Sequence, residues 1–226
     1  MNQVNYQKEL DKIIDGLQGA ERASAPSLFL HSCCAPCSSY VLEYLCRYFR
    51  ITVFYFNPNI SEASEYWKRA EEQKRLIAAY NEETERRMKG CGREPMTTMA
   101  KTCRDYSIKI IEGDHEPERF FEVARGLEQC PEGGERCFAC YALRLNETAK
   151  WAKAGSYDYF TTTLSISPLK NAAKLNEIGE RLAQEYNILW LPSDFKKRDG
   201  YKRSIELSRE YELYRQDYCG CVYSRR

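Results

Sequence analysis

Short apolar, β-rich runs alternate with longer helical patterns along this 226-residue chain. Runs rich in branched and aromatic residues predict five strands, at 27–31, 51–56, 107–111, 157–163 and 187–192. Helical periodicity predicts helices at 37–49, 61–82, 117–126, 138–154, 169–185 and 203–215. Strands separated by helices favour an α/β fold with a parallel five-stranded sheet and helices on both faces. Right-handed crossovers usually give the strand order 3-2-1-4-5, with ligands bound at the topological switch between the first and fourth strands.

Composition places this alternation in one globular unit. With 43% hydrophobic residues, the chain can bury a sizeable core. No Pro/Gly/Ser-rich linker divides it, so we expect a single domain over residues 1–226. The net charge is only +1, and a nucleic-acid partner would therefore be held by a local basic patch and not by overall attraction.

The sequence carries no recognisable export or membrane signal. Residues 1–17 are polar, with apolar residues at helical spacing, unlike the apolar core of a signal peptide. No run reaches the roughly eighteen apolar residues of a membrane-spanning helix. We therefore expect a cytoplasmic protein in a reducing compartment, with no membrane partner.

Seven of the eleven cysteines fall into three compact groups. The groups are Cys33, Cys34 and Cys37; Cys137 and Cys140; and Cys219 and Cys221. Thiolates at such short spacings are what an iron–sulfur cluster or a thiolate-rich metal centre needs. Structural disulfides are the weaker interpretation, because the number of cysteines is odd and two adjacent cysteines have poor geometry for a disulfide bond. The isolated cysteines are not expected to be ligands; these are Cys46, Cys91, Cys103 and Cys130.

The first cysteine group is expected at the topological switch. The first strand ends at His31 and runs directly into Cys33 and Cys34, while the fourth strand ends in the Thr/Ser-rich run 161–167. Both segments should therefore face one crevice. The Thr/Ser run suits either a phosphate or ribose contact or an ordinary helix cap, and His31 is expected to be a hydrogen-bonded strand-end residue.

The other two groups are expected to reach the same place. Cys137 and Cys140 stand at the start of a helix, where residues three apart share one face. We expect the helix N-terminus to lower the pKa of both thiols. The preceding loop, 131–136, contains two glycines that would let the backbone approach a cluster. Gly220 permits a turn that aims both flanking cysteines inward.

The sequence lacks the residues that imidazole-rich metal sites and nucleotide-binding loops require. His31 and His115 are the only histidines, which excludes imidazole-rich zinc sites. No Walker-type or G-x-G-x-x-G nucleotide loop is evident. Basic residues gather near the expected crevice, where they suit RNA phosphates or form a solvated loop, and both interpretations stay open. They are Lys170, Lys196, Lys197, Arg198, Lys202 and Arg203.

Five ordered segments closely resemble the epoxyqueuosine reductases of the QueH family. They are HSCCAPCSSYVLEYL (31–45), YFNPNISEASEYWKRAEEQ (55–73), PEGGERCFACYALRLNETA (131–149), TTTLSISPLKN (161–171) and DFKKRDGYKRSIELSREYELYRQDYCGCVYS (194–224). The resemblance implies a Rossmann-type fold like that of the adenine nucleotide alpha hydrolases (HUP). It also implies a 4Fe–4S cluster beside a separate mononuclear metal, iron or zinc, and a tRNA substrate carrying epoxyqueuosine at the wobble position.

Carried over by position, the resemblance makes six cysteines ligands: Cys33, Cys34, Cys137, Cys140, Cys219 and Cys221. Cys37 stands where the family places another ligating side chain. Seven thiolates suit two centres better than one, because a cubane takes four ligands, and the allocation of sulfurs to centres stays open. Two segments are expected to depart from the family core: an N-terminal helical extension at 1–24 and an insertion at 83–104, which holds Cys91 and Cys103.

The implied reaction is a two-electron, two-proton removal of the epoxide oxygen, with release of water. A metal with an open position would stabilise charge developing on that oxygen, and a cluster would deliver electrons one at a time from a low-potential donor. Candidate proton donors are Asp114, Tyr218 and a metal-bound water. Neither ATP nor cobalamin is expected to take part.

Two other functions remain open on the sequence alone. An ATP-dependent tRNA thiolase or sulfurtransferase of similar fold would need a pyrophosphate loop such as S-G-G-x-D-S after the first strand, where this chain has HSCCAPCSS. A zinc-stabilised RNA-binding module would hold one closed four-thiolate site.

Overall fold

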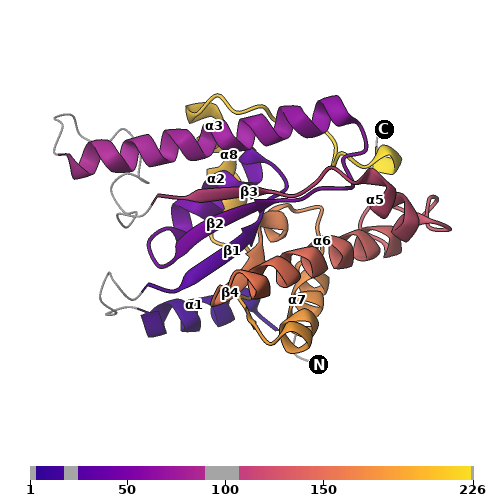
Figure 1. Cartoon of the computed structure of the whole chain (residues 1–226), viewed down its shortest axis with the longest axis horizontal. Coiled ribbons are helices and arrows are strands. Elements are labelled where there is room, and N and C mark those ends of the chain that lie inside the picture. The colour runs from indigo at the N-terminus through magenta and orange to yellow at the C-terminus, as the bar shows by residue number, and fades with distance from the viewer. Residues whose placement is uncertain (1–3, 18–24, 90–106, 225–226) are drawn as a thin grey trace.

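The computed structural model describes residues 4–17, 25–89 and 107–224. It has an all-parallel five-stranded sheet in the order β3-β2-β1-β4-β5, which confirms the expected fold class and strand order (Figure 1). The strands are β1 (Ser27–His31), β2 (Arg50–Tyr55), β3 (Lys109–Glu112), β4 (Tyr159–Thr162) and β5 (Leu189–Trp190).

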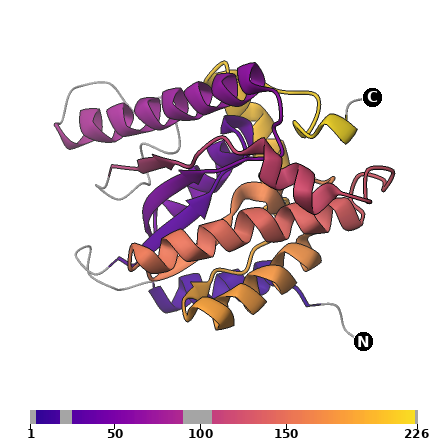
Figure 2. The same ribbon diagram turned by 45° about the vertical axis from the view of Figure 1, so that its right-hand side comes forward.

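Helices cover both faces of the sheet (Figures 1 and 2). They are α1 (Tyr6–Leu17), α2 (Ala35–Leu45), α3 (Ala63–Met88), α5 (Pro117–Ala124), α6 (Glu135–Ala154), α7 (Ala172–Tyr186) and α8 (Gly200–Glu210), with short 3-10 helices η2 (Thr163–Ile166) and η3 (Val222–Ser224). Strand β1 shows how the two layers arise. Leu28 and Leu30 pack with α1, α2 and α3, while Phe29 packs with α6 and α7. A strand buried on both faces reads as a continuous apolar run, as SLFLH does.

Element boundaries differ from expectation in ways that matter for the site. Helix α6 begins three residues earlier than predicted, at Glu135, which places Cys137 and Cys140 in its first turns. Residues 83–88, expected to begin an insertion, continue α3, and 90–104 lie outside the described residues. The N-terminal extension forms α1 as expected. Within the described ranges, no helix is long and apolar enough to cross a membrane.

Candidate metal centre

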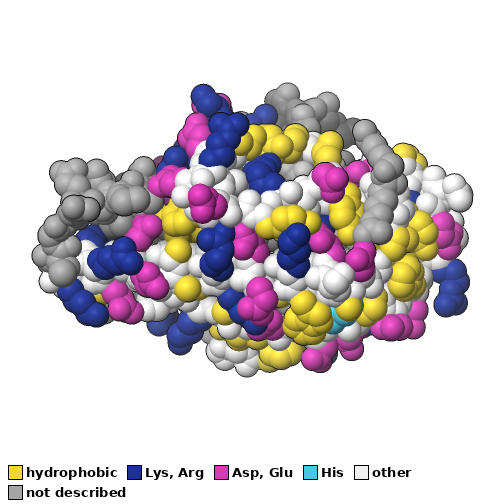
Figure 3. All heavy atoms as spheres, turned by 90° about the horizontal axis from the view of Figure 1, so that it is seen from above, with side chains coloured by type: hydrophobic (Ala, Val, Ile, Leu, Met, Phe, Trp, Pro, Cys, Tyr) yellow, Lys and Arg dark blue, Asp and Glu magenta, His cyan; other side chains and the backbone are white. Residues whose placement is uncertain are grey.

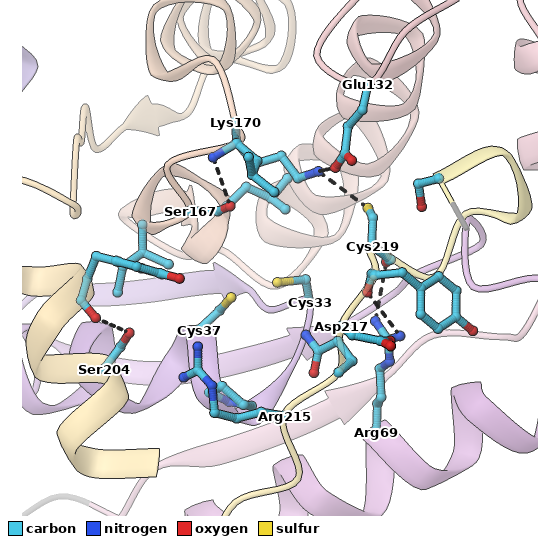
Figure 4. A pocket seen from close by; sticks show the side chains of 18 of the residues that line it. Cys33, Cys37, Arg69, Glu132, Ser167, Lys170, Ser204, Arg215, Asp217 and Cys219 are labelled. Atoms are coloured by element: carbon cyan, nitrogen blue, oxygen red, sulfur yellow. Dashed lines mark hydrogen bonds and ion pairs between the residues drawn. The ribbon is translucent and has the colours of Figure 1, made fainter. Parts of the chain in front are cut away.

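A cavity of about 630 Å³ opens beyond the carboxyl ends of β1 and β4. Its walls come from the β1–α2 turn, η2 and the segment after it, α8 and the C-terminal segment 215–219. Figure 4 shows Cys33 and Cys37 projecting into it from the β1–α2 side and Cys219 from the C-terminal segment. The cavity thus lies at the topological switch, where the strand order predicts that ligands bind.

The first sulfur group, Cys33, Cys34 and Cys37, is compact. All three Sγ atoms lie within 4.8 Å of one another, and those of Cys33 and Cys34 are 3.7 Å apart. A tetrahedral ion with metal–sulfur bonds near 2.3 Å has ligand sulfurs about 3.8 Å apart. Cys34 is the extended N-cap of α2, and Pro36 lies in the first turn of the helix, so the turn places Cys37 beside the other two. The spacing fits one metal ion.

The three thiols of this group differ in how readily they lose a proton. Hydrogen bonds from Cys34 and Cys37, and the charge of Arg144, hold the pKa of Cys33 well below its usual range. The same sharing with Cys33, together with burial, raises the pKa of Cys34 to about 12 and that of Cys37 well above its usual value. One thiolate is therefore already favoured, and a cation would displace the remaining protons. Gln216 Nε2 also donates to Cys34 Sγ at 2.9 Å.

The second sulfur group, Cys137, Cys140, Cys219 and Cys221, joins the first turns of α6 to the C-terminal segment. Cys140 and Cys221 are buried in one apolar cluster against α5. Cys137 and Cys219 interact electrostatically with both of them. No three of these four sulfurs lie within 4.8 Å of one another, in contrast to the first group. Wider spacing suits a multi-atom cluster better than a single ion.

The expected effect of the α6 N-terminus on Cys140 is wrong. Burial raises the pKa of Cys140 to about 12, even with Arg144 close by. Burial likewise raises the pKa of Cys221. The apolar packing against Phe120 and Ala124 desolvates the thiols, and this outweighs the helix-end field that the sequence suggested.

Helix α3 anchors the C-terminal half of the second group. Arg69 donates to the carbonyl oxygens of Cys219 and Tyr218 at 3.2 and 3.4 Å, and its charge is balanced by Glu65 at 2.6 Å. Asn59 Nδ2 donates to the Cys219 carbonyl at 3.3 Å. Gly220 has a φ of +96°, which confirms the turn expected between the two cysteines. Arg69 and Asn59 thus hold this segment through its backbone carbonyls.

A backbone donor and a lysine both approach sulfurs of the second group. The Gly133 N–H lies 3.2 Å from Cys137 Sγ, so the glycine loop does approach this site with its backbone. Lys170 Nζ lies 3.5 Å from Cys219 Sγ and 2.9 Å from Glu132, as Figure 4 shows. Hydrogen bonds of this kind stabilise thiolate sulfur and tune metal centres.

Arg144 is a functional residue that the sequence reasoning missed. It is 1% exposed, lines the cavity, and donates to His31 Nε2 at 3.3 Å and to Cys140 Sγ at 4.0 Å. The available signal was its position one helical turn after Cys140, on the same face of α6. Arg69 and Gln216 were also missed, because their contacts with the site join distant parts of the chain.

Comparison with known proteins decides the family. The family model described as "Epoxyqueuosine reductase QueH" matches residues 28–226. This chain belongs to that family. The protein named epoxyqueuosine reductase QueH from Staphylococcus epidermidis is 42% identical over 223 residues, covering 98% of this chain and 84% of the relative. Relatives of the same name from Staphylococcus aureus (39%, covering 98% and 84%) and Thermotoga maritima (28%, covering 88% and 90%) agree.

His31 and the Thr/Ser run behave as ordinary structural elements of this family member. Burial, and then the charge of Arg144, lower the pKa of His31 to about 3, so the ring is neutral. Its Nδ1 lies 2.8 Å from Thr162 Oγ1, and Thr162 also accepts the Leu164 N–H as the cap of η2. The run thus acts as a helix cap, one of the two roles expected for it.

The two candidate proton donors are placed differently. Tyr218 lines the cavity next to Cys219, with its ring 5.2 Å from the Arg69 guanidinium. Asp114 follows β3 at the edge of the sheet, is exposed and does not line the cavity.

The basic residues expected to contact tRNA divide into paired and unpaired groups. Lys196 pairs with Asp194 at 2.5 Å, Arg198 with Asp11 at 2.6 Å, and Arg203 with the buried Glu43 at 2.8 Å. Lys197 and Lys202 are exposed, and no ion pair involves either in the described ranges. Lys170 is buried and faces Cys219 and Glu132.

The seven grouped cysteines are all free thiols, as expected. Of the isolated ones, Cys130 is free, and Cys46 is disulfide-bonded and buried in the core. The expectation for Cys91 and Cys103 falls outside the described residues.

Proposed function

We propose that this protein is an epoxyqueuosine reductase that converts epoxyqueuosine at the wobble position of tRNA to queuosine. The observation that carries the proposal is the meeting of two separate sulfur groups at one cavity in a member of the QueH family. Epoxide removal needs an electron source and is assisted by a Lewis acid, and two thiolate-rich centres would supply the two functions side by side.

The two groups differ in a way that allocates the centres. The tight triad of Cys33, Cys34 and Cys37 suits the mononuclear metal, iron or zinc. The wider set of four, Cys137, Cys140, Cys219 and Cys221, matches the ligand number of a 4Fe–4S cluster. When bound, the cluster supplies single electrons and the ion polarises the epoxide oxygen.

The surrounding residues of the chain bind and orient the modified base. A cavity of about 630 Å³ is large enough for a nucleoside turned out of its stack. Tyr201 of α8 is 37% exposed and lines this cavity, where its ring offers a stacking surface. Of the two proton donors considered, Tyr218 is favoured because it lines the cavity and Asp114 does not.

The tRNA approaches the cavity mouth in this proposal. Lys197 precedes α8 and Lys202 lies in its first turn; both are exposed, form no ion pair in the described ranges, and are suited to phosphate contacts. The face over α3 is unsuited, because Lys and Arg side chains are interspersed there with Asp and Glu (Figure 3). Ion pairs such as Lys74–Glu71 and Arg86–Glu82 account for this mixture.

The test is single-turnover reduction by protein purified and reconstituted without air. Tenfold excess dithionite and tRNA containing epoxyqueuosine should give queuosine without ATP or cobalamin, detected by mass spectrometry of the nucleosides. The protein should carry about four iron and four sulfide per chain, plus one further metal. Cys130→Ser, which alters a free thiol outside both groups, is the control and should remain active.

Two outcomes would replace the proposal. An ATP-dependent thiolated nucleoside would favour a sulfurtransferase. One zinc per chain with no acid-labile sulfide and no turnover would favour an RNA-binding module.

A further inference from the structure

Three arginines are almost fully buried in the described part of the chain: Arg69, Arg136 and Arg144. A buried guanidinium destabilises the fold unless acceptors or opposite charge compensate it. The partners of each arginine therefore identify what balances its charge.

Two of the three have ordinary protein partners. Arg69 pairs with the Glu65 carboxylate at 2.6 Å. Arg136 donates to the backbone carbonyls of the loop before α6, those of Leu127, Glu128 and Cys130. Oxygen acceptors surround both guanidinium groups.

Arg144 differs from both. Its acceptors in the described part of the chain are one amide oxygen, on Asn57, the ring nitrogen of His31, and the sulfur of Cys140. No described carboxylate forms an ion pair with it. A histidine ring carries no negative charge in either of its protonation states, so His31 cannot balance the charge either.

The side chains near Arg144 that can carry a compensating negative charge are cysteines of both groups. Its guanidinium interacts electrostatically with Cys140 and Cys219 of the second group and with Cys33 of the first. It also lines the cavity that separates them. One fixed cation is thus shared between two sites that each gather several cysteines.

We infer that Arg144 is the shared counter-charge of the two sulfur centres and that it makes the cluster at the second group easier to reduce. The inference rests on the proposed function, which places a 4Fe–4S cluster at those four cysteines. Reduction adds an electron to a centre that is already anionic, and a fixed positive charge nearby stabilises the reduced state more than the oxidised one. Low dielectric around the buried side chain strengthens this effect.

A purely structural role for Arg144 makes a different prediction. Arg144 links α6 to Asn57, whose Nδ2 donates to the Ser32 carbonyl at 2.9 Å in the β1–α2 turn. If this link were its whole function, hydrogen bonding and shape would matter and charge would not. Charge-conserving and charge-removing variants separate the two roles.

The experiment is a redox titration of the reconstituted holoenzyme with dithionite, followed by the electron paramagnetic resonance signal of the reduced cluster. Arg144→Gln retains a donor for Asn57 and removes the charge, so its midpoint potential should be more negative than that of the wild type. Arg144→Lys should remain near the wild type. Lys150→Met, on the same helix with a side chain 63% exposed, is the matched control and should not change the potential.

Iron content makes every outcome decisive. An unchanged potential in a fully loaded Arg144→Gln variant overturns the inference. If that variant loses its iron while Arg144→Lys retains it, charge is the required property and the inference stands; loss of iron from both shows that shape is required and overturns it. Wild-type protein without acid-labile sulfide refutes the proposed cluster before any variant is compared, so the two failures are distinguishable.

Discussion

The two sulfur groups of the cavity are built in different ways. The triad of Cys33, Cys34 and Cys37 comes from one turn between β1 and α2, and its sulfurs lie within 4.8 Å of one another. The second group takes Cys137 and Cys140 from α6 and Cys219 and Cys221 from the C-terminal segment, with β4, α7, β5 and α8 between them in sequence. The first centre therefore depends on local structure, and the second depends on tertiary contacts between distant parts of the chain.

This difference determines what each centre depends on. The triad is fixed by the end of a central strand, which pairs with β2 and β4, and by the first turn of α2. The second group requires the C-terminal segment to dock on Arg69 of α3 and on Asn59 before that helix, with a turn at Gly220. Perturbing that docking should damage one centre and spare the other.

The largest expected effect comes from removing a ligand of each group. Cys219→Ser should lose nearly all of the roughly four cluster irons and all turnover, because a hydroxyl is a poor substitute for a soft thiolate. Cys37→Ser should keep its acid-labile sulfide and lose only the additional metal. Iron, zinc and sulfide analyses of both proteins after anaerobic reconstitution measure this. Sulfide lost from Cys37→Ser and retained in Cys219→Ser would show that the centres are allocated the wrong way round.

The second-largest effect is expected from removing Arg69, the α3 residue that anchors the C-terminal segment. Arg69→Met removes the cationic partner of the half-buried Glu65 and one donor from each of the Tyr218 and Cys219 carbonyls, which should destabilise the protein by about 3–5 kcal/mol. Cluster loading should fall with it, while the triad retains its metal. Chemical denaturation and metal analysis of the same sample measure both. Arg86→Met, at an exposed ion pair on the same helix, should change stability by less than about 0.5 kcal/mol. Equal loss of both metals would contradict separate assembly.

A smaller effect is expected at the turn between Cys219 and Cys221. A Cβ added at Gly220 would lie 2.7 Å from Ile60 Cγ1, and the backbone of residue 220 has a φ of +96°. Gly220→Ala should therefore cost about 2–4 kcal/mol through backbone strain and overpacking. Gly126→Ala is the matched control, since its φ is +77° and no atom lies within 4 Å of the added Cβ; it should cost only about 1 kcal/mol. Similar costs for both, measured by denaturation, would mean that the Gly220 contact relaxes freely.

The sequence reasoning succeeded where structure is local or follows from topology. Strand order and the place of Cys33 after β1 depend on apolar runs and crossover handedness. It failed where tertiary packing decides. Desolvation by α5 reverses the expected pKa shift of Cys140. The edge position of β3 removes Asp114 from the cavity, although the expected strand order placed β3 at that edge. Lys170 turns inward to Cys219 and Glu132, which its place after the fourth strand does not reveal.

The smallest effect is expected at the cavity mouth, from two lysines that belong to neither sulfur group. Lys197 and Lys202 are exposed and without ion pairs in the described ranges, whereas Arg203 is held by Glu43. Lys197→Glu or Lys202→Glu should leave metal content unchanged, weaken tRNA binding, and reduce the slope of log affinity against log salt by about 0.7–0.9 for each lost phosphate contact. Binding titrations over a salt series measure this, with Arg86→Glu on the α3 face as the charge-matched control. If the control lowers the slope as much as the two lysine variants do, tRNA binds across α3 and the cavity mouth is not its docking face.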